Sequence, residues 1–230
     1  MLLNTYQLSD FHKNHIFNKA YRTKQDILKL LLYATRFILN SEPIAYARTT
    51  GTYLFLRIDK MSRLIFFSEG KTFSISFPFQ YYRYDEFEGR PPYVLMNGLD
   101  YEIDNSVITY LENILENIDL DAIEVWDIIE RLEDIPKDHF DENGKTESFD
   151  KFMSKLFLRL ILSEEGYLRY DYDEKGFKPD NPDLHPYHHL DIFYSSNPTF
   201  KIGLKNGINY SEFINIIDIR TDCRYLSIVI

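Results

Sequence analysis

The sequence predicts an α+β fold in which an antiparallel sheet carries helices packed mainly on one face. Short runs of aromatic and β-branched residues follow one another within residues 44–79, and strand-like alternation returns after Gly166. Stripes of apolar residues at helical spacing lie before and between these two regions. Strands and helices grouped in this way are typical of α+β proteins. We expect a single domain, residues 1–230, with an acidic helical segment in about 100–150.

The first helix is expected from about Lys24 to Leu39. Thr23 precedes it with a hydroxyl suited to an N-cap, and Asp26 places a negative charge in the first turn. Pro43 follows and cannot continue a helix. The positions that form the buried stripe are Ile27, Leu28, Leu31, Leu32, Thr35 and Ile38.

Four strands are expected after Pro43. Gly51 and Gly70 lie between them, and glycine allows the backbone conformations that tight turns require. Such runs joined by short turns indicate antiparallel hairpins. The expected strands are Ile44–Thr49, Tyr53–Asp59, Arg63–Ser68 and Thr72–Phe79.

An aromatic loop and three helices are expected between these strands and Gly166. The loop, residues 80–98, contains Arg83 and Arg90 among its tyrosines; its rings either pack back onto the sheet or stack on bases or on a partner. The first two helices have acidic outer faces, which suit either a solvated surface or a docking surface for a basic partner. The helices are expected at about 106–118, 121–135 and 149–162, with a polar linker at 136–148.

Charge and cysteine content bound the protein's class. The net charge is −10, but residues 100–150 alone hold 17 acidic and 3 basic residues, so the remainder is mildly basic. The single cysteine, Cys223, excludes an intrachain disulfide, and together with a start that does not resemble a signal peptide it predicts a reducing, cytoplasmic location. No apolar run approaches the roughly 20 residues of a membrane span, so no membrane partner is expected.

The stretch from Gly166 to Tyr194 gathers most of the side chains suited to chemistry. Residues Leu168 to Asp173 alternate, which places Arg169, Asp171 and Asp173 on one face of a strand. A loop containing glycine and prolines follows, and the chain returns as a second strand from His188 to Tyr194. If the two strands pair as a hairpin, Asp171 or Asp173 faces one of the histidines. His185 precedes Pro186 and is held extended at the start of the second strand.

Three interpretations of this stretch remain open. Asp171, Asp173, His185 and either His188 or His189 could ligate a divalent metal, because imidazole and carboxylate suit zinc, manganese or iron; the favoured ligands are Asp171, His185 and His188. A histidine oriented by an aspartate could instead act as acid or base. Alternatively, Arg169 pairs with an aspartate in a purely structural network. The candidate catalytic residues are Arg169, Asp171, Asp173, His185 and His188.

The end of the chain is expected to add a strand, Phe200–Leu204, and a helix, Tyr210–Ile217. Asn209 and Glu212 have the spacing of a capping box for that helix. The tail, Arg224–Ile230, is apolar, and such a tail usually pairs with a sheet or with a partner.

These C-terminal residues resemble a bacterial family catalogued as domain of unknown function number 2290. That family typically shows an R-F-D-F-D strand and an H-P-x-x-H-L segment. The matching positions here are Arg169, Asp171, Asp173, His185, Pro186, His188 and Leu190. The family's R-I-P step is replaced here by Lys201-Ile202-Gly203, and the last aromatic residue of its final helix is missing. The resemblance covers about the last third of the chain and implies no established activity.

The sequence favours an accessory, non-catalytic subunit of a bacterial conflict complex, of the antiphage or toxin–antitoxin kind. Acidic helices at about 106–135, the apolar tail and the absence of a strong catalytic signature support this. The alternative is a metal-assisted nuclease or phosphodiesterase that uses the Asp/His cluster, with Arg169 or Lys201 on the phosphate. A third hypothesis is a nucleic-acid binder that uses Arg83 and Arg90 of the aromatic loop.

Overall fold

The structure is a computed structural model that describes residues 2–45, 51–83, 89–120, 122, 127, 149–182, 184–193 and 199–221. It contains two compact units. The first comprises residues 1–20, 43–76 and 166–230, and the second comprises residues 21–42 and 77–165. The expectation of a single domain stays a prediction. The helix expected at 121–135, the linker at 136–148 and the tail at 224–230 lie outside the described residues, apart from Ala122 and Asp127.

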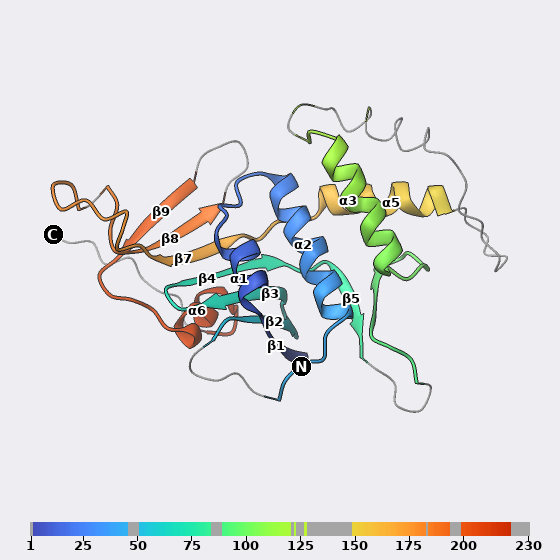
Figure 1. Cartoon of the computed structure of the whole chain (residues 1–230), viewed down its shortest axis with the longest axis horizontal. Helices are drawn as coiled ribbons and strands as arrows, with labels where there is room; N and C mark the ends of the chain where they lie inside the picture. The colour runs from blue at the N-terminus through green and yellow to red at the C-terminus, as the bar shows by residue number, and fades with distance from the viewer. Residues whose placement is uncertain are drawn as a thin grey trace. The chain divides into compact units, whose positions relative to one another are not determined.

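The first unit, here called the sheet unit, is built on a seven-stranded antiparallel sheet (Figure 1). The order of the strands across it is β1-β2-β3-β4-β7-β8-β9, so neighbours in the sheet are also successive strands of this unit. The strands are β1 (Leu2–Gln7), β2 (Tyr53–Ile58), β3 (Ser62–Ser68), β4 (Lys71–Ser76), β7 (Leu168–Tyr172), β8 (His188–Phe193) and β9 (Thr199–Leu204). The α+β class is therefore confirmed.

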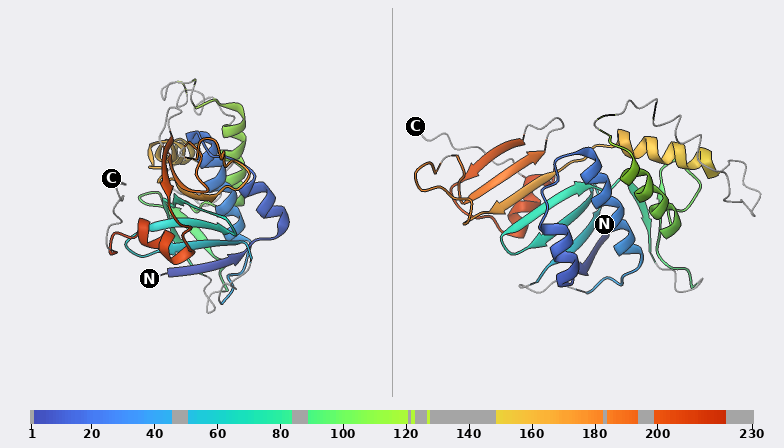
Figure 2. Two further views of the ribbon diagram at one scale, coloured as in Figure 1. Left: turned by 90° about the vertical axis from the view of Figure 1, so that its left-hand side faces the viewer. Right: turned by 45° about the horizontal axis from the view of Figure 1, so that its top comes forward.

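Helices α1 (Asp10–Phe17) and α6 (Tyr210–Ile217) lie on opposite faces of this sheet (Figure 2). On the α1 face, the Phe73 ring stacks on Phe66 at 4.7 Å and meets Phe17 of α1 edge-on at 5.3 Å. On the α6 face, two side chains of α6, Phe213 and Ile214, are buried against the sheet. The sheet residues buried on the α6 face with them are Tyr53, Phe55, Ile65, Leu168, Tyr170 and Leu190. The two faces of the sheet thus have separate apolar cores.

The expected strands agree with the structure except at two places. Only Ile44 of the expected strand Ile44–Thr49 takes part in a described pairing, an isolated bridge to Thr5, and residues 46–49 lie outside the described residues. The expected strand Thr72–Phe79 is divided, because β4 ends at Ser76 and β5 begins at Phe79. Pro78 lies between them, and a proline has no N–H to donate to a sheet ladder.

Helix α6 is held at both ends by polar contacts. The predicted capping box is confirmed, since Asn209 accepts from the Glu212 N–H and Glu212 accepts from the Asn209 N–H. At the other end, Asp218 accepts hydrogen bonds from Arg220 and from Arg57 of β2. These bonds, with that from Arg220 foremost, lower the pKa of Asp218. The ionised carboxylate therefore fastens the end of α6 to the sheet.

Tyr210 of α6 provides a test at alkaline pH. Its ring lies 4.7 Å from that of Phe55, and burial raises the pKa of Tyr210 from 10.0 to about 12. As the pH rises, the Tyr210 hydroxyl loses its proton in the unfolded chain before it does so in the folded protein. The contribution of this burial to the free energy of unfolding is therefore fully present below pH 10 and is lost as the pH rises from 10 to 12. We expect Tyr210→Phe to remove this loss, on the order of 2 kcal/mol at pH 12. Urea unfolding of both proteins from pH 8 to pH 12 measures it; an identical decline in both would contradict the assignment.

The second unit contains three described helices and a two-stranded sheet. They are α2 (Lys24–Leu39), β5 (Phe79–Tyr82), β6 (Tyr93–Met96), α3 (Asn105–Asn117) and α5 (Phe149–Leu162). The predicted N-cap of α2, Thr23, is confirmed, and in the structure it forms a capping box with Asp26. Helices α2 and α3 are joined by an ion pair between Arg36 and Glu112, so one acidic side chain of the expected acidic surface already has a basic partner in this unit.

Residues 80–98 were expected to form an aromatic loop, but part of this segment pairs as strands β5 and β6, and its rings pack on one another. Tyr82 and Tyr93 stack at 4.6 Å, and the Arg90 guanidinium lies over the Tyr93 ring at 3.9 Å. Residues 84–88 lie outside the described residues. Among the described helices, none has both the length and the apolar character that crossing a membrane requires.

Candidate functional site

The hairpin predicted from the sequence is formed by β7 and β8 in the sheet unit. Asp171 lies directly opposite His189, and Arg169 lies opposite Asp191. Strand β4 flanks β7 on its other side and places Lys71 opposite Asp171. Because side chains at directly opposed positions share a face, one face of three neighbouring strands carries all five of these polar residues. It is the α1 face of the sheet.

Gly166 fixes the point at which the chain joins this face. Its φ is 56°, in the left-handed region that glycine adopts without strain. A Cβ atom at this position would lie 2.3 Å from a guanidinium nitrogen of Arg63 and 2.4 Å from the Ser76 hydroxyl. The Gly166 carbonyl instead accepts a hydrogen bond of 2.8 Å from Arg63. The start of β7, and with it the register of Arg169 and Asp171, therefore depends on a residue without a side chain.

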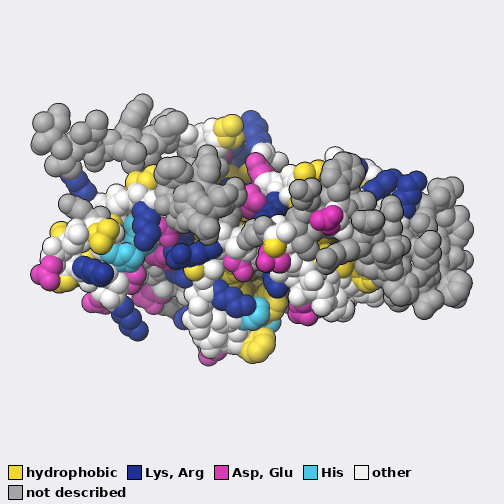
Figure 3. Space-filling view, turned by 90° about the horizontal axis from the view of Figure 1, so that it is seen from above, with side chains coloured by type: hydrophobic (Ala, Val, Ile, Leu, Met, Phe, Trp, Pro, Cys, Tyr) yellow, Lys and Arg dark blue, Asp and Glu magenta, His cyan; other side chains and the backbone are white. Residues whose placement is uncertain are grey.

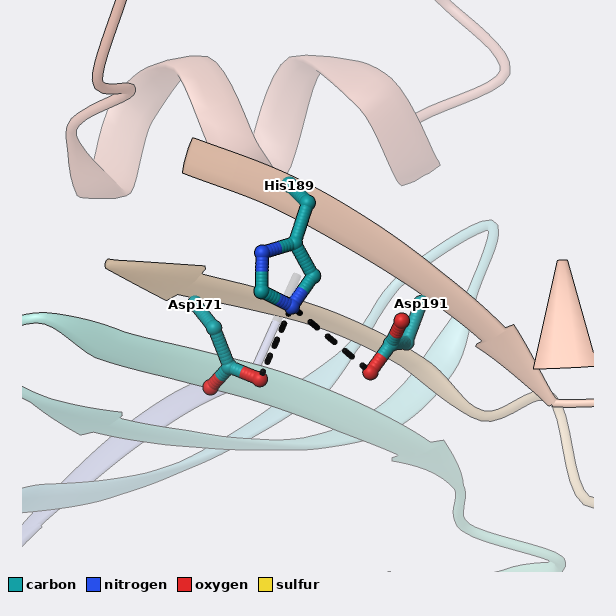
Figure 4. A group of neighbouring side chains, drawn as sticks. All are labelled: Asp171, His189 and Asp191. Atoms are coloured by element: carbon teal, nitrogen blue, oxygen red, sulfur yellow. Dashed lines mark ion pairs between the residues drawn. The ribbon is translucent and has the colours of Figure 1, made fainter. Parts of the chain in front are cut away.

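Four of these side chains form the centre of the candidate site, here called the central cluster: Arg169, Asp171, His189 and Asp191. The Arg169 guanidinium contacts both carboxylates, with Nε 2.6 Å from Asp171 Oδ2 and Nη2 bonded to Asp191 Oδ2. His189 Nε2 lies 3.6 Å from Asp171 Oδ2 and 4.0 Å from Asp191 Oδ2 (Figure 4). One ligand atom from each of Asp171, His189 and Asp191 can be chosen so that all lie within 4.8 Å of one another.

The protonation of His189 follows from its contact with the backbone. His189 Nδ1 is 3.2 Å from the carbonyl oxygen of Pro186, which can only accept a hydrogen bond, so Nδ1 carries a proton. In the neutral imidazole Nε2 then bears a lone pair, and Figure 4 shows that this atom is directed towards both carboxylates. A lone pair facing two anionic groups is stabilised only by a cation, either a proton on Nε2 or a metal ion. Metal-bound histidines in proteins almost always donate their other N–H in this way.

The side chains of the central cluster are largely buried, so the interactions between their charges are stronger than they would be in water. The side chains of His189 and Asp191 are 3% and 5% exposed, and those of Arg169 and Asp171 are each 14% exposed. Asp191 Oδ1 is buried and has no hydrogen-bond partner, which costs free energy unless another group binds it. With a neutral histidine, one guanidinium faces two carboxylates, so the cluster has one negative charge in excess.

Lys71 and Tyr167 border the central cluster. Burial lowers the pKa of Lys71, and the attraction of the Asp171 carboxylate offsets only part of that effect. Its ammonium donates a 2.9 Å hydrogen bond to the carbonyl oxygen of Phe17 at the end of α1. Burial also raises the pKa of Tyr167 to about 12, and its hydroxyl accepts a hydrogen bond from Arg169. Tyr167 therefore stays neutral and helps to hold the guanidinium in place.

Asp173 and His185 form a second, more exposed pair beside the central cluster. His185 Nε2 lies 2.9 Å from Asp173 Oδ2, while Asp173 Oδ1 accepts a 2.8 Å hydrogen bond from the Gly176 N–H. The bond from His185 is the main reason why the pKa of Asp173 is lowered. The His185 and His189 rings lie 5.3 Å apart, so the pair adjoins the cluster. This arrangement matches the predicted histidine oriented by an aspartate.

His188 is the predicted site residue that lies apart from the others. It is directly opposite Tyr172 in the sheet, and its Nδ1 is 2.9 Å from the Tyr170 hydroxyl. Those residues occupy the α6 face, the reverse of the face that carries Asp171. The set Asp171, His185 and His188 is therefore not brought together, and Asp191 and His189 lie beside Asp171 instead. Alternation along β8 already separates His188 from His189, but only the strand register shows which of them meets Asp171.

An open pocket of about 790 Å³ lies over the exposed edge of this site. Asp171, Asp173 and Arg169 line it from β7 and its end. Three lysines complete its charged lining, Lys13 and Lys19 from α1 and the segment after it and Lys71 from β4, together with Glu69. The remaining lining residues are Phe17, Asn18, Ala20, Gly70 and Tyr172. The pocket can therefore admit a small or extended anion next to the central cluster.

Comparison with known proteins finds no family model that matches the chain. It also finds no matching curated protein and no matching solved structure. Membership of the bacterial family that the C-terminal residues resemble stays a prediction.

Proposed function

We propose that the protein is a metal-assisted phosphodiester hydrolase, a nuclease or phosphodiesterase, with its reacting centre at the central cluster. Asp171, His189 and Asp191 would hold one divalent ion. The observation that carries this proposal is the convergence of His189 Nε2 with the carboxylates of Asp171 and Asp191, while His189 Nδ1 lies 3.2 Å from the carbonyl oxygen of Pro186. The buried, unpartnered Asp191 Oδ1 supports it, since a cation would satisfy that oxygen. Two carboxylates and one imidazole suit zinc, manganese or iron.

The neighbouring residues suit the other tasks of phosphodiester hydrolysis. The ion would act as a Lewis acid and supply a nucleophilic water at neutral pH. In the reaction, water adds to phosphorus, one P–O ester bond breaks, and the leaving oxygen takes up a proton. His185 would donate the proton that the leaving oxygen takes up, or accept the proton that the attacking water loses, because Asp173 orients its ring and it is partly exposed. Lys71 and Arg169 line the pocket and would stabilise the negative charge that develops on the phosphate.

The test is to remove bound metal with a chelator and to assay RNA, DNA and bis(p-nitrophenyl) phosphate before and after adding Mn²⁺, Zn²⁺ or Mg²⁺. We expect hydrolysis only with a divalent ion, and a stoichiometry of one ion per chain by titration calorimetry. Absence of both metal binding and hydrolysis would refute the proposal. An Asp180→Asn protein is the matched control, since Asp180 is an exposed carboxylate in the same segment.

His185→Gln separates acid–base action from metal binding. We expect kcat to fall about 100-fold, because the proton donor or acceptor is lost while the central cluster is left in place. Metal affinity should change little, because His185 is not one of the three proposed ligands. Titration calorimetry and initial rates from pH 5 to pH 9 check this expectation. An unchanged kcat and pH profile would show that His185 only closes the loop against Asp173.

A second candidate function is the accessory subunit that the sequence favours. Arg169 supports it, because the guanidinium already contacts both carboxylates and can act as their permanent counter-ion. The central cluster would then be structural, and binding to other proteins would use surfaces such as the acidic helices. Co-purification with a stable protein partner, together with the absence of metal binding, is the result that would favour this function over hydrolysis.

A further inference from the structure

Five aromatic rings form a continuous row at the outer end of β7 and β8. Along the row, ring centroids lie 3.7 Å apart for Phe177 and Tyr187, 6.2 Å for Tyr187 and Tyr172, 5.0 Å for Tyr172 and His188, and 6.1 Å for His188 and Tyr170. The planes of successive rings differ by no more than 29°. Rings from two strands and the loop between them are therefore nearly parallel.

The row is fixed at its inner end and exposed at its centre. The hydrogen bond between His188 and Tyr170 holds the inner end against the sheet. Tyr172 and Tyr187 are 45% and 40% exposed, which is unusual for two adjacent large aromatic side chains. Because their ring planes are set by neighbouring rings, a ligand that stacks on them loses little side-chain entropy of the protein. The row is a pre-organised surface for flat rings.

Lysine residues and the pocket lie next to parts of this row. Lys175 and Lys178 are exposed on the loop that carries Phe177, as are Glu174 and Asp180. Lys205 follows Leu204 of β9, which lies opposite His188. Figure 3 shows a histidine patch at one end of the sheet unit, with both basic and acidic side chains close to it.

The inner rings of the row, Tyr170, Tyr172 and His188, lie on the α6 face, whereas the pocket lies on the α1 face. Tyr172 at the end of β7 also lines the pocket, so a ligand that uses both would pass around the end of this strand. A ligand with flat rings and a negatively charged backbone would match this combination.

We propose that this surface binds single-stranded nucleic acid, with bases stacked on Tyr172 and Tyr187 and the phosphate backbone entering the pocket. The inference rests on the proposed function, because it names the substrate of the same site. Single strands are favoured over duplexes because their bases are free to stack on protein rings. Neighbouring phosphates would meet Lys71 and Lys19 in the pocket and Lys175 outside it.

The experiment measures fluorescence anisotropy of a labelled single-stranded 12-mer, as RNA and as DNA, with the full chain in excess chelator. Binding is then read without metal and without cleavage, so failure of hydrolysis and failure of this inference are distinguishable. We expect Tyr172→Ala and Tyr187→Ala each to weaken binding about tenfold, because each removes one stacking contact. Tyr172→Phe and Tyr187→Phe should bind as the unchanged protein does, and added salt should weaken binding in all of them.

Tyr82→Ala is the matched control, because Tyr82 is also a stacked and partly exposed tyrosine but lies in the aromatic loop. We expect it to bind normally. Loss of binding in Tyr82→Ala but not in Tyr172→Ala would overturn the inference and assign binding to the aromatic loop. Unchanged binding in both alanine variants of the row, or no binding by the unchanged protein, would also overturn it, and the row would then be a surface for a protein partner.

Discussion

Replacing Asp191 by asparagine is expected to abolish metal binding and to lower phosphodiester hydrolysis by on the order of 100-fold or more. The substitution keeps the shape of the side chain but removes the charge from the most buried carboxylate of the central cluster. Asparagine leaves Arg169 facing a single carboxylate, so the negative charge that attracts a cation is gone. Titration calorimetry with Mn²⁺ and initial rates at saturating metal measure the two effects.

Thermal unfolding distinguishes a lost metal site from a lost fold in this variant. Circular dichroism should show native secondary structure in Asp191→Asn, although its unfolding temperature should no longer rise when metal is added. The Asp180→Asn control should keep both metal binding and activity. Full activity in a folded Asp191→Asn protein would exclude the central cluster as the reacting centre.

Phe73→Ala is expected to lower the free energy of unfolding by about 3–5 kcal/mol. The Phe73 ring is fully buried, stacks on Phe66 and also contacts Phe17 and Tyr167. Truncation leaves a cavity between α1 and the sheet, and it removes the packing beside Arg169, which lies directly opposite Phe73 on the neighbouring strand. Chemical denaturation monitored by far-ultraviolet circular dichroism measures the change in the free energy of unfolding.

Phe11→Ala is the matched control for Phe73→Ala. Phe11 lies on α1 but is 72% exposed, so its removal should change the free energy of unfolding by less than about 1 kcal/mol. Equal stability of the two variants would contradict the packing of α1 against this face of the sheet through Phe73. If Phe73→Ala folds only at low temperature, the comparison is made there with all three proteins.

Local sequence patterns were enough to predict most elements of the fold. The capping residues Thr23 and Asn209 marked the starts of α2 and α6, because a cap depends on residues only three positions apart. Alternation of residue types predicted strands β7 and β8, because this pattern also depends only on residues close together in the sequence. Strand Thr72–Phe79 was predicted too long, because its apolar alternation continues beyond the proline that separates β4 from β5.

The candidate site was predicted only in part because it depends on register. The sequence placed Arg169, Asp171 and Asp173 on one face, but it did not show which histidine lies opposite Asp171. The 15-residue connection from Asp173 to Tyr187 can shift that pairing, and a shift by one residue exchanges His188 and His189 between the faces. Lys71, which approaches from β4, is about 100 residues away in sequence, and no local pattern connects it to Asp171.

An anomalous-scattering map from crystals soaked in Mn²⁺ would show whether the central cluster binds a divalent ion. We expect one strong peak bounded by Asp171, Asp191 and the Nε2 atom of His189, with Arg169 moved away from at least one carboxylate. A map with no peak there, and with Arg169 still bridging Asp171 and Asp191, would exclude this metal site and leave the cluster as a structural ion-pair network.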